Sequence, residues 1–211
     1  MASKYYSYVI PRDYGFAPNP FGRECTLATC KPQVRKSAKV GDWVFGTSSI
    51  AKGAKAKIVF AMKVDKVTRF DDYYHAPEFQ YKKPTMNGSL KKMYGDNIYH
   101  KEANEHGKVV WMQDDSHHSL PDGSPNPLNV KKDAGTTDKV LISSDFYYFG
   151  SEGVPIPESL VETVCKKGPG HRYVKQAQAE KLIDYIEDNF EQGINGDPTM
   201  FKNEFQRYNG K

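Results

Sequence analysis

The sequence Val40-Gly41-Asp42-Trp43-Val44-Phe45-Gly46-Thr47 combines a Gly-Asp turn with an apolar strand. A polar loop at residues 48–55 follows, and then a longer run, Lys57-Ile58-Val59-Phe60-Ala61-Met62-Lys63-Val64-Asp65-Lys66-Val67. This run is apolar and rich in β-branched residues, and it alternates toward its end, which is typical of a central strand. Together the two runs predict adjacent strands of one sheet that bends at its corner.

The segments on either side extend this sheet and add helices. Residues 5–10 and 139–150 are rich in tyrosine, phenylalanine and β-branched residues, which favours strands. A short helix is expected from about Glu158. The clearest helix spans residues 176–190, where apolar side chains recur at helical spacing at Leu182, Ile183, Ile186 and Phe190. We therefore predict an α+β fold with a strongly bent mixed or antiparallel sheet, flanking helices and a long C-terminal helix.

The length of 211 residues fits a single domain. Residues 1–192 are expected to form its core. Within them, residues 82–139 are mostly polar with frequent turn signals, which predicts a long functional or mobile loop. Residues 193–211 are polar and are expected to form a loosely docked tail.

Composition narrows the function classes. The net charge of +4 is too small for a dedicated duplex-DNA binder but suits a nucleotide, a phosphate group or a short single strand. The 14 Tyr and 11 Phe against 2 Trp suit a pocket for a planar, polar ligand, although most of these rings are expected in the core. No apolar run approaches the roughly 18 residues of a membrane span. Three cysteines and a polar N-terminus favour a cytoplasmic protein without disulfides.

One cluster of chemically capable residues lies between residues 19 and 35. Lys31 and Arg35 suit an anion such as phosphate, and a cysteine beside these cations would have its thiolate favoured. Asn19 can read a base edge because its amide both donates and accepts. Alternatively, the thiols are small buried hydrophobes. The candidate residues are Asn19, Cys25, Thr26, Cys30, Lys31 and Arg35.

The cysteine spacing is a poor pattern for zinc, because Cys165 is the only further cysteine. We therefore predict no metal site and no cofactor. No Walker or dinucleotide-binding glycine motif is present, which excludes the commonest nucleotide-enzyme folds.

Three other segments carry carboxylates or histidines in loop-like sequence. Asp72 lies in an acidic and aromatic run, Asp96 and Asn97 form a polar turn, and residues 114–118 read Asp-Asp-Ser-His-His. Asp72 and His171 are candidates for an acid–base pair, and the carboxylates beside histidines at 71–75 and 114–118 could alternatively hold a metal ion. His171 and Arg172 follow a Gly-Pro-Gly loop, where an anion could bind. Solvated charge in loops, and an ion pair for Arg172, are the ordinary alternatives.

The pattern Gly41-Asp42-Trp43, the strand at 57–67 and Phe70-Asp71-Asp72-Tyr73 resemble the PUA-like β-barrels. These include the EVE, YTH and ASCH domains, which hold a flipped or modified base in an aromatic pocket. This resemblance implies a pseudo-barrel fold.

A closer, nearly full-length resemblance is to the nucleotide modification associated domain family, type two. It is carried in order by residues 15–21, 25–27, 30–32, 41–43, 95–99 and 146–150. The resemblance implies a role in nucleic-acid base modification in bacteria and phages, or in related defence biology. It implies no particular catalytic residue.

Three functions follow as alternatives. The first is binding of a nucleobase or nucleotide, in particular a modified one, or of a single strand. Trp43 or tyrosines would stack on the base, and Asn19 or Asp96 would select it. The second is an enzyme that acts on such a ligand, with Cys25 or Cys30 as nucleophile or with Asp72 and His171 as acid and base. The third is a protein–protein adaptor. The ligand hypotheses predict that Asn19, Cys25, Lys31, Trp43, Asp72 and His171 converge on one pocket.

Overall fold

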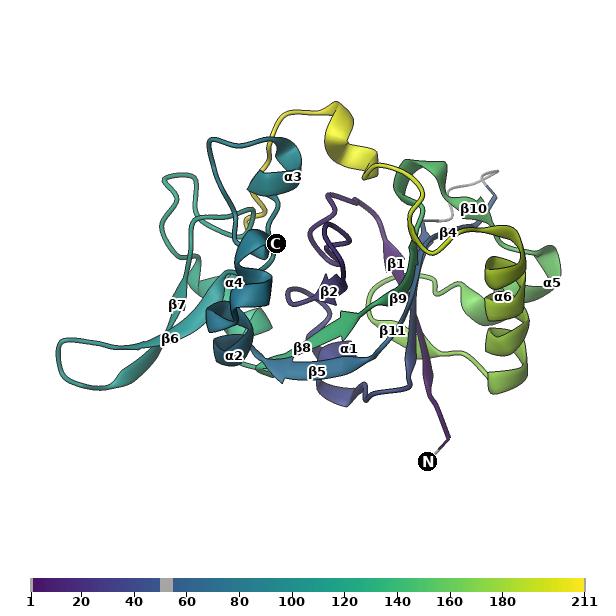
Figure 1. The fold of residues 1–211 in the computed structure, drawn as a ribbon, viewed down its shortest axis with the longest axis horizontal. Helices are drawn as coiled ribbons and strands as arrows, with labels where there is room; N and C mark the ends of the chain where they lie inside the picture. The colour runs from purple at the N-terminus through teal and green to yellow at the C-terminus, as the bar shows by residue number, and fades with distance from the viewer. Residues whose placement is uncertain (1, 50–54, 211) are drawn as a thin grey trace.

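The computed structural model describes residues 2–49 and 55–210, so part of the predicted loop 48–55 lies outside the described residues. Its largest unit is a mixed sheet, the main sheet, whose strands stand near the centre of Figure 1. β1 is parallel to β3, and β3, β4 and β9 follow one another antiparallel. The strand order is β11 (His171–Tyr173), β1 (Tyr5–Ile10), β3 (Trp43–Ser48), β4 (Lys57–Lys63), β9 (Asp145–Tyr148) and β12 (Gly193–Ile194), with β10 (Val154–Pro155) also paired to β4.

A second, antiparallel sheet, the small sheet, has the order β2 (Cys25–Leu27), β8 (Lys139–Ser143) and β5 (Lys66–Arg69). The predicted strand at 57–67 therefore divides. β4 ends at Lys63, and the chain passes through Val64 and Asp65 into the other sheet. Strands β6 (Tyr99–Ala103) and β7 (Val109–Gln113) form a hairpin that projects from the body.

Helices lie on both sides of these sheets. The α-helices are α1 (Pro32–Ser37), α2 (Phe70–His75), α3 (Leu90–Met93), α4 (Pro127–Asp133), α5 (Glu158–Val164) and α6 (Gln176–Asn189). Three 3-10 helices, η1 (Pro77–Lys82), η2 (Gly150–Glu152) and η3 (Thr199–Lys202), complete the assignment within the described residues. α6 confirms the helix predicted from periodicity, because Leu182, Ile183 and Ile186 are its buried stripe.

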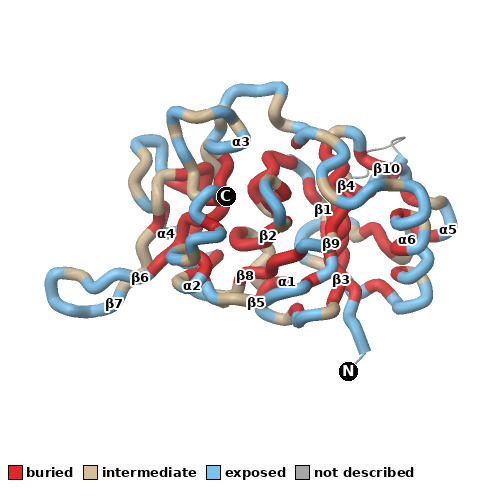
Figure 2. The backbone as a smooth tube through the Cα atoms, viewed as in Figure 1, coloured by how far each residue is buried: buried red, intermediate tan, exposed pale blue. Residues whose placement is uncertain are grey.

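Three hydrophobic cores follow from this layering. The first lies between α5 and α6 and one face of the main sheet, and it includes Trp43, Phe45 and Leu182. The second lies between the opposite face of the main sheet and the small sheet, and it includes Tyr8 and Leu141. The third lies beyond the small sheet against α2 and the base of the hairpin. Figure 2 shows these buried stretches as red segments through the middle of the molecule.

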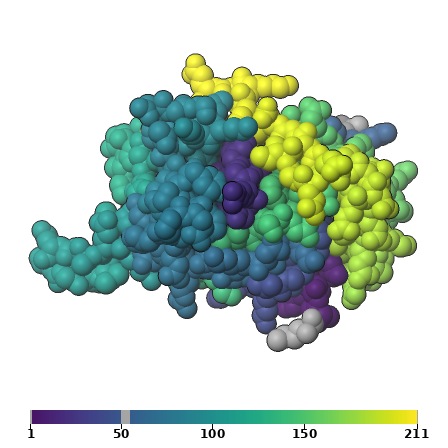
Figure 3. Space-filling view, in the orientation of Figure 1, coloured from purple at the N-terminus to yellow at the C-terminus, as the bar shows by residue number. Residues whose placement is uncertain are grey.

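The α+β prediction is confirmed, but the described residues form no closed barrel, so the PUA-like pseudo-barrel is not confirmed. The polar segment 82–139 differs from the predicted long loop, because it contains α3, the β6–β7 hairpin and α4. The C-terminal residues form η3 and a strand-free segment that crosses the top of the molecule, yellow in Figure 3. Within residues 2–49 and 55–210, no helix has the length and apolar character of a membrane span.

Candidate functional site

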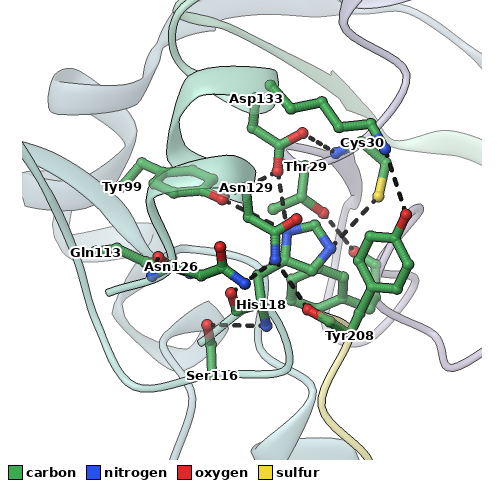
Figure 4. Close-up of polar contacts among 12 residues, drawn as sticks. Thr29, Cys30, Tyr99, Gln113, Ser116, His118, Asn126, Asn129, Asp133 and Tyr208 are labelled. Carbon is green, nitrogen blue, oxygen red and sulfur yellow. Dashed lines mark hydrogen bonds and ion pairs between the residues drawn. The ribbon is translucent and has the colours of Figure 1, made fainter. Parts of the chain in front are cut away.

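A thiol, an imidazole and a carboxylate meet where α1, α4 and the segment before α4 come together (Figure 4). The sulfur of Cys30 lies 3.6 Å from Nε2 of His118. On the other side of the ring, Nδ1 of His118 lies 3.0 Å from Oδ2 of Asp133. His118 and Asp133 are buried, whereas Cys30 is partly exposed. This is the nucleophile–base–orienting group arrangement of covalent catalysis.

The backbone at Cys30 is held in an uncommon conformation. Cys30 and Lys31 have φ angles of 55° and 38°, in the left-handed region that residues with a Cβ atom rarely adopt. Pro32 then begins α1, with its fixed φ suited to the first helical turn. The Cys30 N–H donates to Oδ1 of Asp133 at 2.9 Å. Such strained residues persist where surrounding contacts over-determine them, and they cluster at functional sites.

Asp133 is the last residue of α4. The helix begins with Pro127, and the Asn126 side chain caps it by accepting from the Leu128 N–H at 3.0 Å. The Asp133 carboxylate also accepts from the Tyr99 hydroxyl at 3.0 Å. Both of its oxygens thus have donors, and the carboxylate fixes the orientation of His118.

Arg35 joins the segments that carry Cys30 and Asp133. Its side chain is fully buried and donates to the backbone carbonyls of Cys30 at 2.8 Å, Lys139 at 2.7 Å and Asp133 at 2.8 Å. Because all three bonds go to backbone, Arg35 fixes the scaffold around the thiol.

The electrostatics of the site favour a charged imidazole. Burial alone would lower the pKa of His118, but the neighbouring Cys30 sulfur and the Asp133 carboxylate outweigh burial and raise it to about 9. Burial would raise the pKa of Asp133, but its hydrogen bond with His118 and the positive charges of His118 and Arg35 lower it. These shifts favour an imidazolium–carboxylate pair at neutral pH.

The other thiols are in different environments. Burial raises the pKa of Cys25 to about 12 and that of Cys165 to about 11. Both are buried, so neither is poised to react as a thiolate.

The C-terminal segment lies against the site. The Tyr208 N–H donates to the carbonyl of His117, and its carbonyl accepts from Asn129 Nδ2 at 2.9 Å. Its ring centroid lies 5.5 Å from that of His118, and its hydroxyl accepts from the Lys132 ammonium at 3.3 Å. Tyr208 therefore covers the imidazole without bonding to it.

The same three side chains, Cys30, His118 and Asp133, each offer one ligand atom, all within 4.8 Å of one another, so they could also approach a metal ion. However, both Asp133 oxygens already accept hydrogen bonds, and the carboxylate faces Nδ1 of His118 rather than an open position. The arrangement fits proton transfer better than metal coordination.

The family model of nucleotide modification associated domain 2 matches residues 2–205. The chain belongs to this family. Its name associates the chain with nucleotide modification, and the match contains the whole Cys30–His118–Asp133 cluster. Comparison with curated proteins and with solved structures gives no match.

The site residues predicted from the sequence lie in separate parts of the structure. Cys30, Lys31 and Arg35 lie together at the cluster described above. A second, fully buried network contains Asn19, Cys25, Thr26 and Asp96 around the ammonium of Lys82. Lys82 donates to the carbonyls of Asn19 and Glu24 and to the Asn19 side chain. The polar side chains of this network therefore form hydrogen bonds with one another and with nearby backbone carbonyls.

The remaining predicted residues lie apart from both groups. Asn97 is buried and donates to the carbonyls of Tyr73 and Phe79. Trp43 is 6% exposed and stacks on Phe45 in the core beneath α6. Asp72 is exposed in α2. His171 and Arg172 lie on the edge strand β11, and Arg172 donates to the carbonyls of Glu162 and Cys165. The predicted residues do not converge on one pocket, and their roles as ligand contacts stay predictions.

Sequence reasoning missed Asp133 and Tyr99 and did not select His118 from the run at 114–118. The only signal for His118 was that this run pairs carboxylates with histidines. Nothing local marks Asp133, which is 103 residues from Cys30.

Proposed function

We propose that this protein is an enzyme that acts on a nucleobase or nucleotide through a covalent bond between the Cys30 sulfur and an electrophilic carbon of the substrate. The observation that carries the proposal is the alignment of the Cys30 thiol, the His118 imidazole and the Asp133 carboxylate. Membership of the nucleotide modification associated domain 2 family supports the substrate class. A free nucleotide, a modified base or a single strand would each present such a carbon.

The geometry defines one chemical step. The Cys30 thiolate attacks the carbon, and a carbon–sulfur bond forms as the π electrons of that carbon move to the adjoining atom. His118 then gives its Nε2 proton to the negative charge that develops there, and Asp133 stabilises the imidazole throughout. Reversal returns the proton to His118 and expels the thiolate.

Thiol reactivity tests the nucleophile. The native protein is treated with limiting iodoacetamide at pH 7, and the alkylated peptides are quantified by mass spectrometry. We expect Cys30 to react first, because it is partly exposed and paired with His118, while Cys25 and Cys165 react slowly. His118→Ala should slow the reaction of Cys30 by at least tenfold, and Cys25→Ser should leave it unchanged.

Substrate chemistry tests the enzyme itself. A panel of nucleosides, nucleotides and single strands, with and without modified bases, is screened for a mass adduct that Cys30→Ser abolishes. Equal and slow labelling of all three thiols would overturn the nucleophile. Saturable binding that Cys30→Ser leaves intact, with no adduct and no turnover, would instead support a binding module.

A further inference from the structure

Two lysines lie beside the nucleophile without a role in the step above. Lys31 directly follows Cys30, and its ammonium lies 4.4 Å from the centre of the Tyr8 ring and donates to the carbonyl of Val9 at 3.3 Å. Lys132 directly precedes Asp133, and its ammonium is held by the Tyr208 hydroxyl. They belong to two elements that meet at Cys30 and Asp133, the start of α1 and the end of α4.

Within residues 2–49 and 55–210, neither lysine forms an ion pair with a carboxylate, since no carboxylate oxygen lies within 4.0 Å of either ammonium. Burial lowers the pKa of Lys31, the Cys30 sulfur raises it and the charge of Lys132 lowers it, so the field of Lys132 reaches Lys31. Two cations in such proximity attract an anion.

The charges around the thiol do not balance. Lys31, Arg35, Lys132 and His118, whose pKa is raised to about 9, face the Asp133 carboxylate and the Cys30 sulfur. Arg35 cannot meet a ligand, because it is fully buried and all three of its bonds go to backbone carbonyls. The excess positive charge therefore resides on the two lysines that solvent can reach.

We propose that Lys31 and Lys132 form a phosphate subsite beside Cys30, so that the substrate is a phosphate-bearing nucleotide rather than a free base or nucleoside. The inference rests on the proposed function and names its substrate class. A phosphate dianion would match the two uncompensated charges and would accept hydrogen bonds from both ammonium groups. The phosphate could belong to a free nucleotide or to the backbone of a single strand.

Protection of Cys30 from iodoacetamide measures this subsite. The probes are inorganic phosphate, a nucleoside, its 5′-monophosphate and a short single strand, each titrated at constant ionic strength to find the concentration that halves the alkylation rate. We expect the monophosphate to protect at a concentration at least tenfold lower than the nucleoside does, as one charge-assisted bond predicts. A further gain with the single strand would identify a backbone phosphate as the source.

Neutral variants assign the effect to these lysines. Lys31→Gln and Lys132→Gln should each remove most of the difference between nucleoside and monophosphate. Lys36→Gln and Lys131→Gln, which change exposed lysines within α1 and α4, are the matched controls and should leave the difference intact. Halving concentrations are compared within each variant, so a change in the intrinsic reactivity of Cys30 does not enter the result.

The outcomes separate this inference from the proposed function. If Cys30 reacts selectively but nucleoside and monophosphate protect equally, the phosphate subsite is wrong and the nucleophile stands. If Cys30 is not selectively reactive, the proposed function fails, and calorimetric titration of the same four probes into the native protein and the lysine variants still decides the subsite. Binding of the monophosphate that is equally strong in all four variants contradicts it.

Discussion

The guanidinium of Arg35 ties together two residues that lie far apart in sequence. It donates to the carbonyls of Cys30 and Asp133, and its centre lies 5.1 Å from that of the Phe70 ring. A lysine at this position could offer only a compact ammonium, which cannot reach carbonyls in the directions of a planar fork. The position of Cys30 relative to Asp133 therefore depends on the shape of this side chain as well as on its charge.

We predict that Arg35→Lys lowers the free energy of unfolding by about 3 kcal/mol, because it leaves buried carbonyls without donors and moves a buried charge. Urea unfolding monitored by fluorescence measures the loss. Arg69→Lys is the matched control, since Arg69 pairs with Asp138 at the exposed surface and its replacement should have little effect. Equal losses in the two variants would contradict the scaffold role.

His118 gives the site a distinct pH dependence. Its folded pKa, about 9, lies above the value of about 6.5 expected in the unfolded chain. The charged imidazole thus contributes stability that is fully present below about pH 6.5 and is lost as pH rises through 9. NMR titration of the His118 ring should show a protonated imidazole at pH 7. Urea unfolding from pH 6 to 10 should show a decrease in the free energy of unfolding as pH rises.

Two variants assign this dependence to its causes. Cys30→Ser and Asp133→Asn each remove a group that raises the pKa of His118, so each should move the His118 titration to lower pH. Cys25→Ser, which changes a buried thiol of the neighbouring network, should leave it in place. A His118 ring that titrates near 6.5 in the native protein would contradict the ion pair.

At this scale the sequence indicated part of the site and missed the rest for a physical reason. Cys30 and Lys31 were found because a thiol beside cations is a local pattern. His118 and Asp133 are 88 and 103 residues from Cys30, so only tertiary packing brings them to the thiol. Asn19, Thr26 and Asp96 have suitable chemistry, but their polar atoms bond within a buried network that residue type alone does not reveal.

Among the elements, the C-terminal segment has the closest relation to the site. Phe201 and Phe205 pack on Tyr94, the Gln206 carbonyl lies 2.5 Å from Nδ1 of His117, and Arg207 pairs with Asp115. These contacts lead to Tyr208 over His118. The sequence predicted a loosely docked tail because the segment is polar, but its few aromatic residues and backbone bonds anchor it.

We predict that Tyr208→Ala increases the alkylation rate of Cys30 several-fold while the unfolding transition changes little. The ring is only partly buried, so its removal uncovers the imidazole at small cost in packing. Tyr173→Ala, which removes a tyrosine that is 55% exposed on β11, serves as the control. An unchanged rate in Tyr208→Ala would mean that the segment does not limit access to the thiol.

In the molecule as a whole, the main sheet separates the core beneath α5 and α6 from the Cys30–His118–Asp133 cluster. The sequence predicted β1, β3, β4 and β9 of the main sheet because alternation and β-branched residues are local signals, but it did not predict the short strands β10, β11 and β12. It did not predict that the chain changes sheet between β4 and β5, since partner choice depends on distant strands: β5 pairs with β8, whose Leu141 opposes Val67. The described residues form three sheets and no closed barrel, with a core on each side of the main sheet.

This separation predicts that the free energy of unfolding and the alkylation rate of Cys30 can be changed independently. Leu182 is fully buried between α6 and the main sheet, in the core that contains Trp43 and Phe45. Leu182→Ala should lower the free energy of unfolding by about 2–5 kcal/mol through lost burial and a cavity. Lys181→Ala, at the adjacent exposed position, should change it little.

Cys30 lies beyond the opposite face of that sheet, where Lys31 contacts the ring of Tyr8. As long as Leu182→Ala remains folded, the Cys30 alkylation rate should therefore match that of the native protein, and His118→Ala should still slow it. The measurement is alkylation at a temperature well below the unfolding midpoint of the variant, with Cys25 labelling as the indicator of global opening. Alkylation of Cys30 that is slower in Leu182→Ala, while Cys25 stays unreactive, would contradict this prediction. It would mean that the α6 core and the Cys30–His118–Asp133 cluster are coupled through the main sheet.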